Sequence, residues 1–145
     1  MRICLQRVQN ARVLVDDQTV GQIGPGLVLL VGFKQGDTDA GIPAMARKIA
    51  EMRIFEDEHD KMNLSLLDLK LSVLVVSQFT LYADTRRGRR PSFTDALEPA
   101  AAEKLYLRMI DAFQSMGLTV AAGQFGAKML VEINNWGPVT IVLED

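Results

Sequence analysis

Ser77, Gln78 and Thr80 stand where a buried strand should end, and their side chains could bind a polar ligand. The preceding run VLVV, residues 73–76, is wholly apolar, and the polar residues follow in SQFTLY, residues 77–82. Sheet proteins often place ligands at the carboxyl ends of such strands. Hydroxyls there can equally do no more than satisfy backbone groups, and the segment alone favours that structural interpretation. Thr80 is a conceivable nucleophile, but no histidine or lysine base stands beside it.

Four arginines follow closely in TRRGRRP: Arg86, Arg87, Arg89 and Arg90 surround a glycine. Guanidinium groups suit phosphate oxygens, and a glycine lets such a loop fold over a nucleic-acid backbone. Charge runs are more often solvated loops. The closeness of this one to SQFTLY favours contact with phosphate, from a nucleotide or from RNA.

Phe125 lies between small residues in AAGQFGAKM, residues 121–129. An aromatic ring on such a turn could stack on a nucleic-acid base. It could equally be a core residue between turn glycines, and the sequence favours neither interpretation.

The composition argues against several familiar kinds of catalytic and metal-binding site. His59 is the only histidine, and its acidic loop lacks the glycine that a calcium loop requires, so we interpret the loop as solvated. Cys4 is the only cysteine, which excludes an internal disulfide and predicts a buried structural thiol in a reduced, cytoplasmic protein. Walker, GxGxxG, HExxH and paired CxxC motifs are absent, so we expect no metal and no cofactor.

Bulk properties narrow the class of protein further. The chain has 145 residues, of which 48% are hydrophobic, and its formal net charge is −2. This length suits one domain, residues 1–145, with a sizeable core. The weak negative charge argues against a protein coated in nucleic acid, and no apolar stretch is long enough to cross a bilayer.

A mixed α/β fold must position these residues, with mostly antiparallel strands and about two main helices. Asp37–Asp39 offer N-cap oxygens and Pro43 suits a first helical turn, whereas Gly117 ends the second helix. Ile54 continues the helical spacing of apolar residues in the first expected helix. The expected strands cover residues 2–17, 18–26, 26–34, 71–84 and parts of 118–145, the helices cover 37–57 and 97–117, and a loop or hairpin covers 56–70.

Two separated motifs carry a resemblance to a known family. SQFTL at residues 77–81 and NWGPVT at residues 135–140 resemble the motifs of D-aminoacyl-tRNA deacylases, the chiral proofreading enzymes. The likeness runs essentially end to end, including QRVQNARVLVDD near the start and the spacing from Gly123 to Met129. It implies a barrel-like fold, a homodimer, and hydrolysis of tRNA esters of D-amino acids, with glycyl-tRNA as a further substrate.

The resemblance also assigns a role to Gly137 and Pro138. In that family the peptide bond between them is cis, and the pair projects from one subunit into the partner's active site. Its carbonyl oxygens would face the substrate's α-carbon and leave no room for the side chain of an L-amino acid. A steric wall of this kind rejects all L-forms without reading side-chain identity.

The other site residues follow from the resemblance in the same way. Ser77, Gln78, Phe79 and Thr80 would form the catalytic segment, in which backbone N–H groups near Phe79 and Thr80 hold the substrate carbonyl. No side chain would be indispensable, because the 2′-hydroxyl of the tRNA's terminal adenosine would assist the attacking water. Phe125 and Met129 would contact substrate, Arg7 would brace the Gly-Pro pair, and the four arginines would contact tRNA phosphates. Tyr82 departs from the family pattern, in which a small residue is common.

Two other interpretations remain open from the sequence. A non-catalytic RNA-binding module would explain the arginines and the missing catalytic triad, and a purely structural dimer would make both motifs coincidental. We expect no membrane partner and no DNA partner under any of them.

Overall fold

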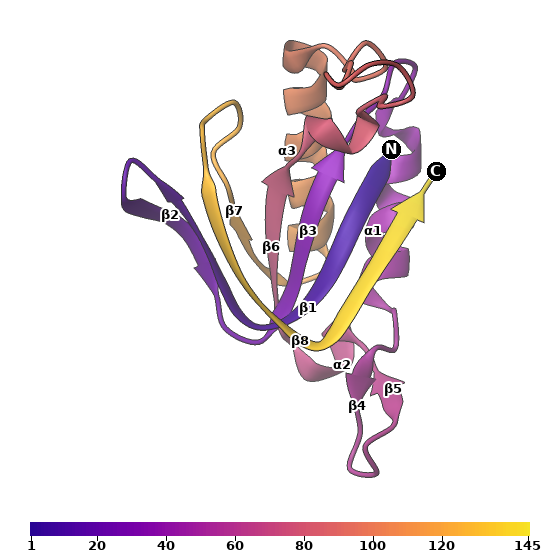
Figure 1. The fold of residues 1–145 in the computed structure, drawn as a ribbon. Coiled ribbons are helices and arrows are strands. Elements are labelled where there is room, and N and C mark those ends of the chain that lie inside the picture. Colours follow the sequence, from indigo (N-terminus) through magenta and orange to yellow (C-terminus); the bar gives the residue numbers. More distant parts are fainter.

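A curled sheet with helices packed on one side makes up the fold, in a computed structural model that describes residues 1–145 (Figure 1). The sheet has six strands in the order β2-β1-β3-β6-β7, and β8 pairs with β1. Its strands are β1 (Arg2–Val15), β2 (Gln18–Ile23), β3 (Gly26–Gly32), β6 (Ser72–Ser77), β7 (Thr119–Ala122) and β8 (Leu130–Glu144). A two-stranded hairpin, β4 (Phe55–Glu56) and β5 (Met62–Leu64), lies apart from this sheet. The helices are η1 (Asp39–Gly41), α1 (Ile42–Ala50), α2 (Leu66–Leu69), η2 (Phe79–Tyr82) and α3 (Pro99–Ser115).

The pairing of strands confirms the mixed, mostly antiparallel sheet. β1 runs antiparallel to β2, β3 and β8, whereas β6 runs parallel to β3 and β7. β1 and β8 are long and bend together, as Figure 1 shows, so the sheet curls into a near-closed barrel. The curl brings β2 against β7 at Gly21, where an added Cβ would lie 2.4 Å from the carbonyl oxygen of Ala122.

Two apolar clusters fill the fold. The larger one lies between the sheet and helices α1 and α3, and the smaller one lies inside the curled sheet around residues such as Val13, Val28 and Leu74. Tyr106, Met109 and Phe113 form the buried face of α3, as its helical spacing predicts.

The first predicted helix and one predicted strand are shorter than expected. α1 ends at Ala50 instead of continuing to residue 57, and Ile54 is buried outside it, where its carbonyl oxygen accepts a hydrogen bond from Arg7. Within the stretch Asp37–Asp39, which was expected to offer N-cap oxygens, the Thr38 side chain caps η1, whereas α1 itself begins after Gly41 without a side-chain cap. Pro43 does occupy the first turn of α1, and α3 ends before Gly117, which has φ +80°. The strand predicted to reach residue 84 ends at Ser77 and continues as the short helix η2.

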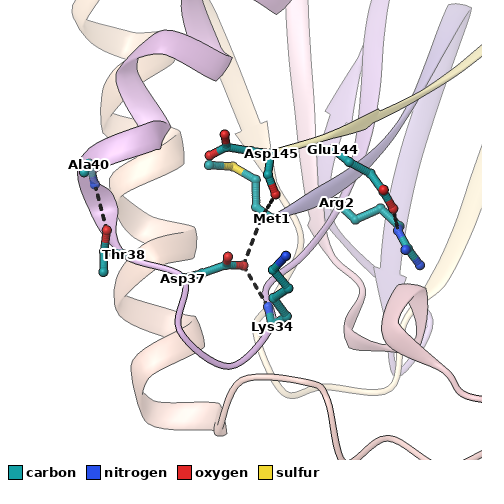
Figure 2. A network of polar contacts seen from close by, with 8 residues as sticks. All are labelled: Met1, Arg2, Lys34, Asp37, Thr38, Ala40, Glu144 and Asp145. Carbon is teal, nitrogen blue, oxygen red and sulfur yellow. Dashed lines mark hydrogen bonds and ion pairs between the residues drawn. The ribbon is translucent and has the colours of Figure 1, made fainter.

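The two chain ends are tied together beside the turn that follows β3 (Figure 2). The Met1 ammonium group lies 3.0 Å from Oδ2 of Asp37, and the same oxygen accepts the N–H of Lys34 at 2.8 Å. The N–H of Asp145 donates to the Met1 carbonyl oxygen at 3.0 Å. This network around the buried Met1 therefore fixes the position of residues 34–37 against the end of the sheet.

Candidate functional site

A pocket opens at the carboxyl ends of β3 and β6, where the sequence places its polar segment. Its volume is about 380 Å³, and most of its lining is apolar. The lining comes from the end of β3 and residue 33, from residues 77–79, from residues 93 and 96–99 with Ala102 on α3, and from residues 125–126. The parallel pairing of β3 with β6 brings Val31 opposite Ser77, so two of these segments meet at one edge of the sheet.

Part of the predicted catalytic segment lines the pocket and part of it does not. Ser77, Gln78 and Phe79 line the pocket, but Thr80 does not. The Gln78 amide nitrogen donates a hydrogen bond to the Thr80 hydroxyl, so both side chains are turned towards each other. The first backbone hydrogen bond of η2 runs from the Leu81 N–H to the Gln78 carbonyl oxygen. The N–H groups of Phe79 and Thr80 come before this bond, at the start of the helix, where backbone donors have no partner within the helix. This segment can offer backbone donors, and its geometry contains no nucleophile paired with a base.

Aromatic rings form the pocket's walls. The exposed Phe79 packs edge-on against Phe93 with 5.1 Å between ring centroids. Phe125 also lines the pocket, and its ring centroid lies 5.8 Å from that of Tyr106. Phe125 is thus a pocket residue that also contacts the core, and its stacking on a base stays a prediction.

Arg7 and the Gly137–Pro138 pair lie together at the bend of β1 and β8. Arg7 is only 2% exposed, and its guanidinium group donates to the carbonyl oxygens of Trp136 (3.0 Å) and Ile54 (2.7 Å). It also pairs with Glu56 at 3.4 Å and stacks on the Trp136 ring. The Gly137–Pro138 peptide bond is cis, and both residues are exposed. The structure therefore brings Arg7 and the Gly-Pro pair together, but it places them away from the pocket of their own chain.

The strand register gives the size of that separation. Ser77 is level with Val31 and Ile3, whereas Gly137 and Pro138 fall between the partners of Val8 and Gln6. Arg7 lies four positions after Ile3 on β1, which corresponds to about 13 Å along the strand. One copy of the chain cannot use its own Gly-Pro pair to line its own pocket.

Met129 and one of the four arginines have other contacts within the chain, and their predicted contacts with substrate and phosphate stay predictions. Met129 packs inside the curled sheet and does not line the pocket. Arg86 is bound to Asp84 through two side-chain contacts of 2.8 Å, which lower the pKa of Asp84 to about 2. Arg87, Arg89 and Arg90 are exposed. Asp84 and Ser92 exchange backbone hydrogen bonds at the base of this loop, next to the pocket residue Phe93.

Glu98 is the one titratable side chain in the pocket lining, and the other titratable residues lie outside the pocket. His59 is exposed on the β4–β5 hairpin, and the prediction of a buried Cys4 was wrong, because its thiol is half-buried on the sheet face away from the helices. Partial burial raises the pKa of Cys4, and desolvation raises the pKa of Tyr82 to about 12. No group of three or more His, Cys, Asp or Glu side chains is arranged to hold a metal ion. No helix is both long enough and apolar enough to cross a membrane.

Sequence reasoning missed Phe93, the segment 96–99 and the support from Tyr106. Phe93 follows the arginine run closely, so its aromatic type was a usable signal. Residues 96–99 reach the pocket because residues 33–35 bond to residues 95–97, a contact between distant parts of the chain that no local pattern reveals. The support from Tyr106 likewise depends on a contact between distant parts of the chain.

Comparisons with known proteins agree with this geometry. Residues 4–144 match the family described as D-Tyr-tRNA(Tyr) deacylase. The chain is 56% identical over 144 residues to the D-aminoacyl-tRNA deacylase of Heliobacterium modesticaldum, covering 99% of this chain and 96% of that protein. It is 50% identical to the D-aminoacyl-tRNA deacylase of Clostridioides difficile, covering 99% of this chain and 97% of that protein.

Two solved structures share the fold. A structure titled c-Myc DNA Unwinding Element Binding Protein superposes with a TM-score of 0.92 at 38% identity, over 100% of this chain and 99% of that chain. A probable eukaryotic D-amino acid tRNA deacylase superposes with a TM-score of 0.85 at 19% identity, over 98% of this chain and 97% of that chain, which supports the fold alone. With the family match across almost its whole length, the chain belongs to the D-aminoacyl-tRNA deacylase family.

Proposed function

We propose that the chain hydrolyses the ester bond between a D-amino acid and the terminal adenosine of tRNA. The observation that supports this proposal is a largely apolar pocket at the end of β6, to which residues 77–79 and Phe125 contribute. The chain that forms it matches this family over residues 4–144. Glycyl-tRNA is a second substrate in this proposal, because glycine has no side chain on either side of its α-carbon.

The chemistry requires no side-chain nucleophile. An aminoacyl ester is already activated, so oriented backbone donors that stabilise the developing oxyanion can supply much of the catalysis. The N–H groups of Phe79 and Thr80 are the proposed donors, which agrees with the Thr80 hydroxyl being bonded to Gln78 outside the pocket. The 2′-hydroxyl of the adenosine assists a water molecule whose oxygen bonds to the carbonyl carbon. The bond to the ribose oxygen then breaks, and that oxygen takes up a proton.

Chiral selection comes from a second copy of the chain in this proposal. Because Gly137 and Pro138 lie about 13 Å along the strands from their own pocket, they can line only a partner's pocket. The pair is exposed, and the face of β1 and β8 away from the helices carries the apolar Val142, which is 62% exposed. A homodimer that covers this face would also bring each Gly-Pro pair towards the partner's Ser77 end. The pair's carbonyl oxygens then exclude the side chain of an L-amino acid.

The exposed arginines Arg87, Arg89 and Arg90 are the proposed contacts for tRNA phosphates. Their loop is anchored beside Phe93, so a tRNA end in the pocket would pass close to it. Arg86 contributes less, because Asp84 already neutralises it. The expectation that the protein binds no DNA stays a prediction.

Hydrolysis of D-tyrosyl-tRNA and L-tyrosyl-tRNA by the purified protein tests this function. We expect release of D-tyrosine and no measurable release of L-tyrosine under the same conditions. Equal rates on both esters would contradict the proposal. Tight, salt-sensitive tRNA binding without ester turnover would favour the RNA-binding module instead.

A further inference from the structure

Tyr106 connects the two walls of the pocket without lining the pocket itself. It lies on α3 one turn after the pocket residue Ala102 and is 2% exposed. The two walls that it contacts are the end of β6, which leads into Ser77, and the end of β7, which leads into Phe125.

The Tyr106 hydroxyl lies at the point where the paired strands separate. It is 2.8 Å from the carbonyl oxygen of Val75 and 3.2 Å from that of Gly123, so its single proton is shared between two acceptors on two strands. The last rung between β6 and β7 is the bond from the Gly123 N–H to the same Val75 oxygen, at 2.9 Å. The hydroxyl therefore closes the ladder where the chain turns away to carry Phe125 into the pocket.

The Tyr106 ring supports Phe125 from behind. Their centroids are 5.8 Å apart with the planes inclined at 46°. Phe125 sits in a short turn closed by the bond from the Ala127 N–H to the Gln124 carbonyl oxygen, with Gly126 at φ +75°. Phe125 is held by its packing against the core, of which the Tyr106 ring is part.

Packing alone would not require the hydroxyl. Met109 and Phe113 fill the rest of the buried face of α3 with apolar groups alone, and a phenylalanine would fill nearly the same space as Tyr106. Burying a hydroxyl is unfavourable unless it is bonded. Desolvation raises the pKa of Tyr106 to about 12, so the group remains a protonated donor at neutral pH.

We propose that Tyr106 is a positioning residue for the terminal adenosine of the substrate, because it sets the separation between the Ser77 wall and the Phe125 wall. This inference rests on the proposed deacylase function. Its contact with the substrate is indirect, through Phe125 and the end of β6, so it acts on binding in the pocket and not on the attacking water.

Tyr106→Phe tests the proposal, since it removes only the hydroxyl. The probe is 3′-(D-tyrosylamino)-3′-deoxyadenosine, an amide analogue of the substrate's end that the enzyme cannot readily hydrolyse. We expect its Kd, measured by calorimetry, to rise about tenfold, because the Phe125 wall is no longer held at its distance from the Ser77 wall. With D-tyrosyl-tRNA we expect a higher KM and a kcat within about twofold of the unaltered protein, the split expected for lost binding.

Two control variants separate positioning from loss of stability. Met109→Ala leaves a cavity on the same buried face of α3 and destabilises the fold, but it should leave the Kd of the analogue unchanged. Tyr82→Phe removes a hydroxyl from the other tyrosine, which lies outside the pocket lining, and should also leave the Kd unchanged.

A double-mutant cycle with Phe125→Leu tests the route of the effect. If Tyr106 acts through Phe125, Tyr106→Phe adds little once that ring is gone, so the two effects are non-additive. An unchanged Kd in Tyr106→Phe, or full additivity, would overturn the proposal. If Tyr106→Phe does not fold, Phe125→Leu alone still tests the proposal. An unchanged Kd of the analogue in Phe125→Leu would overturn the proposal as well. If the unaltered protein fails to hydrolyse D-tyrosyl-tRNA, the proposed function fails first, independently of Tyr106.

Discussion

The two ends of the first half of β1 are built in different ways. At the Ile3 end, aromatic rings and backbone groups form the walls of the pocket. The proposed catalytic segment there is exposed, and the exposed fraction of Phe79 is 57%. At the Arg7 end, a buried guanidinium group holds the bend through Trp136, Ile54 and Glu56. The comparison indicates that the pocket end is adaptable, as a site for many side chains must be. The bend is rigid, as a steric wall must be.

Arg7→Ala should break the rigid end and have the largest effect. It leaves the Ile54 carbonyl oxygen without its donor and removes the support of Trp136, so we expect a loss of about 3 kcal/mol in the free energy of unfolding. Urea denaturation measures this loss. Arg12→Ala on the same strand is the control, because the Arg12–Glu132 pair is exposed and should leave the stability unchanged. Equal effects of the two substitutions would mean that the bend is not held by Arg7.

Asp37→Ala tests the anchor behind the pocket end. Asp37 bonds the buried Met1 ammonium group and the Lys34 N–H (Figure 2), so its removal should cost about 2 kcal/mol of stability. Thermal unfolding gives the measurement, with the exposed Asp39→Ala as its control. A melting temperature equal to that of Asp39→Ala would contradict a stabilising role.

Replacing Arg87, Arg89 and Arg90 together by alanine should weaken tRNA binding without affecting folding. We expect the slope of log Kd against log salt concentration to fall by about 2–3, since each lost phosphate contact lowers it by about one. Filter binding across a salt series measures the slope. Arg86→Ala should change it less, because Asp84 occupies that side chain. An unchanged slope in the triple variant would remove the loop from the tRNA contact surface.

Thr80→Ala should have the smallest effect, at the adaptable end. The hydroxyl lies outside the pocket and bonds to Gln78, so we expect kcat to stay within about threefold of the unaltered protein. Single-turnover hydrolysis of D-tyrosyl-tRNA gives the rate. A loss of about 10⁴-fold, typical of a missing nucleophile, would show that a side chain carries the chemistry.

The sequence predicted the local features of this fold better than the distant ones. Pro43 and Gly117 act locally, through a fixed φ and a left-handed turn, and both lie where the helices begin and end. Ile54 matched the helical spacing but lies outside α1, because tertiary contacts with Arg7 override the pattern. Met129 packs against the smaller apolar cluster because the sheet curls, and a sequence does not reveal curl.

The site followed the same division. Ser77 and Phe125 could be found because a strand end and a glycine-flanked ring are local signals. Tyr106 could not be found, because its hydroxyl matters only where α3 crosses the ends of β6 and β7. The distance between the Gly-Pro pair and the pocket also required the strand register.

Subunit complementation tests the central claim most directly, because it asks whose Gly137 lines a given pocket. Ala102→Trp fills the pocket, and Gly137→Val displaces the wall, since a Cβ there would lie 2.8 Å from Nη2 of Arg7. Each variant alone should be inactive on D-tyrosyl-tRNA. Mixed and refolded together, they should recover about a quarter of the unaltered activity, because half of the dimers are mixed and each holds one complete site. No recovery in verified mixed dimers would contradict a wall contributed by the partner.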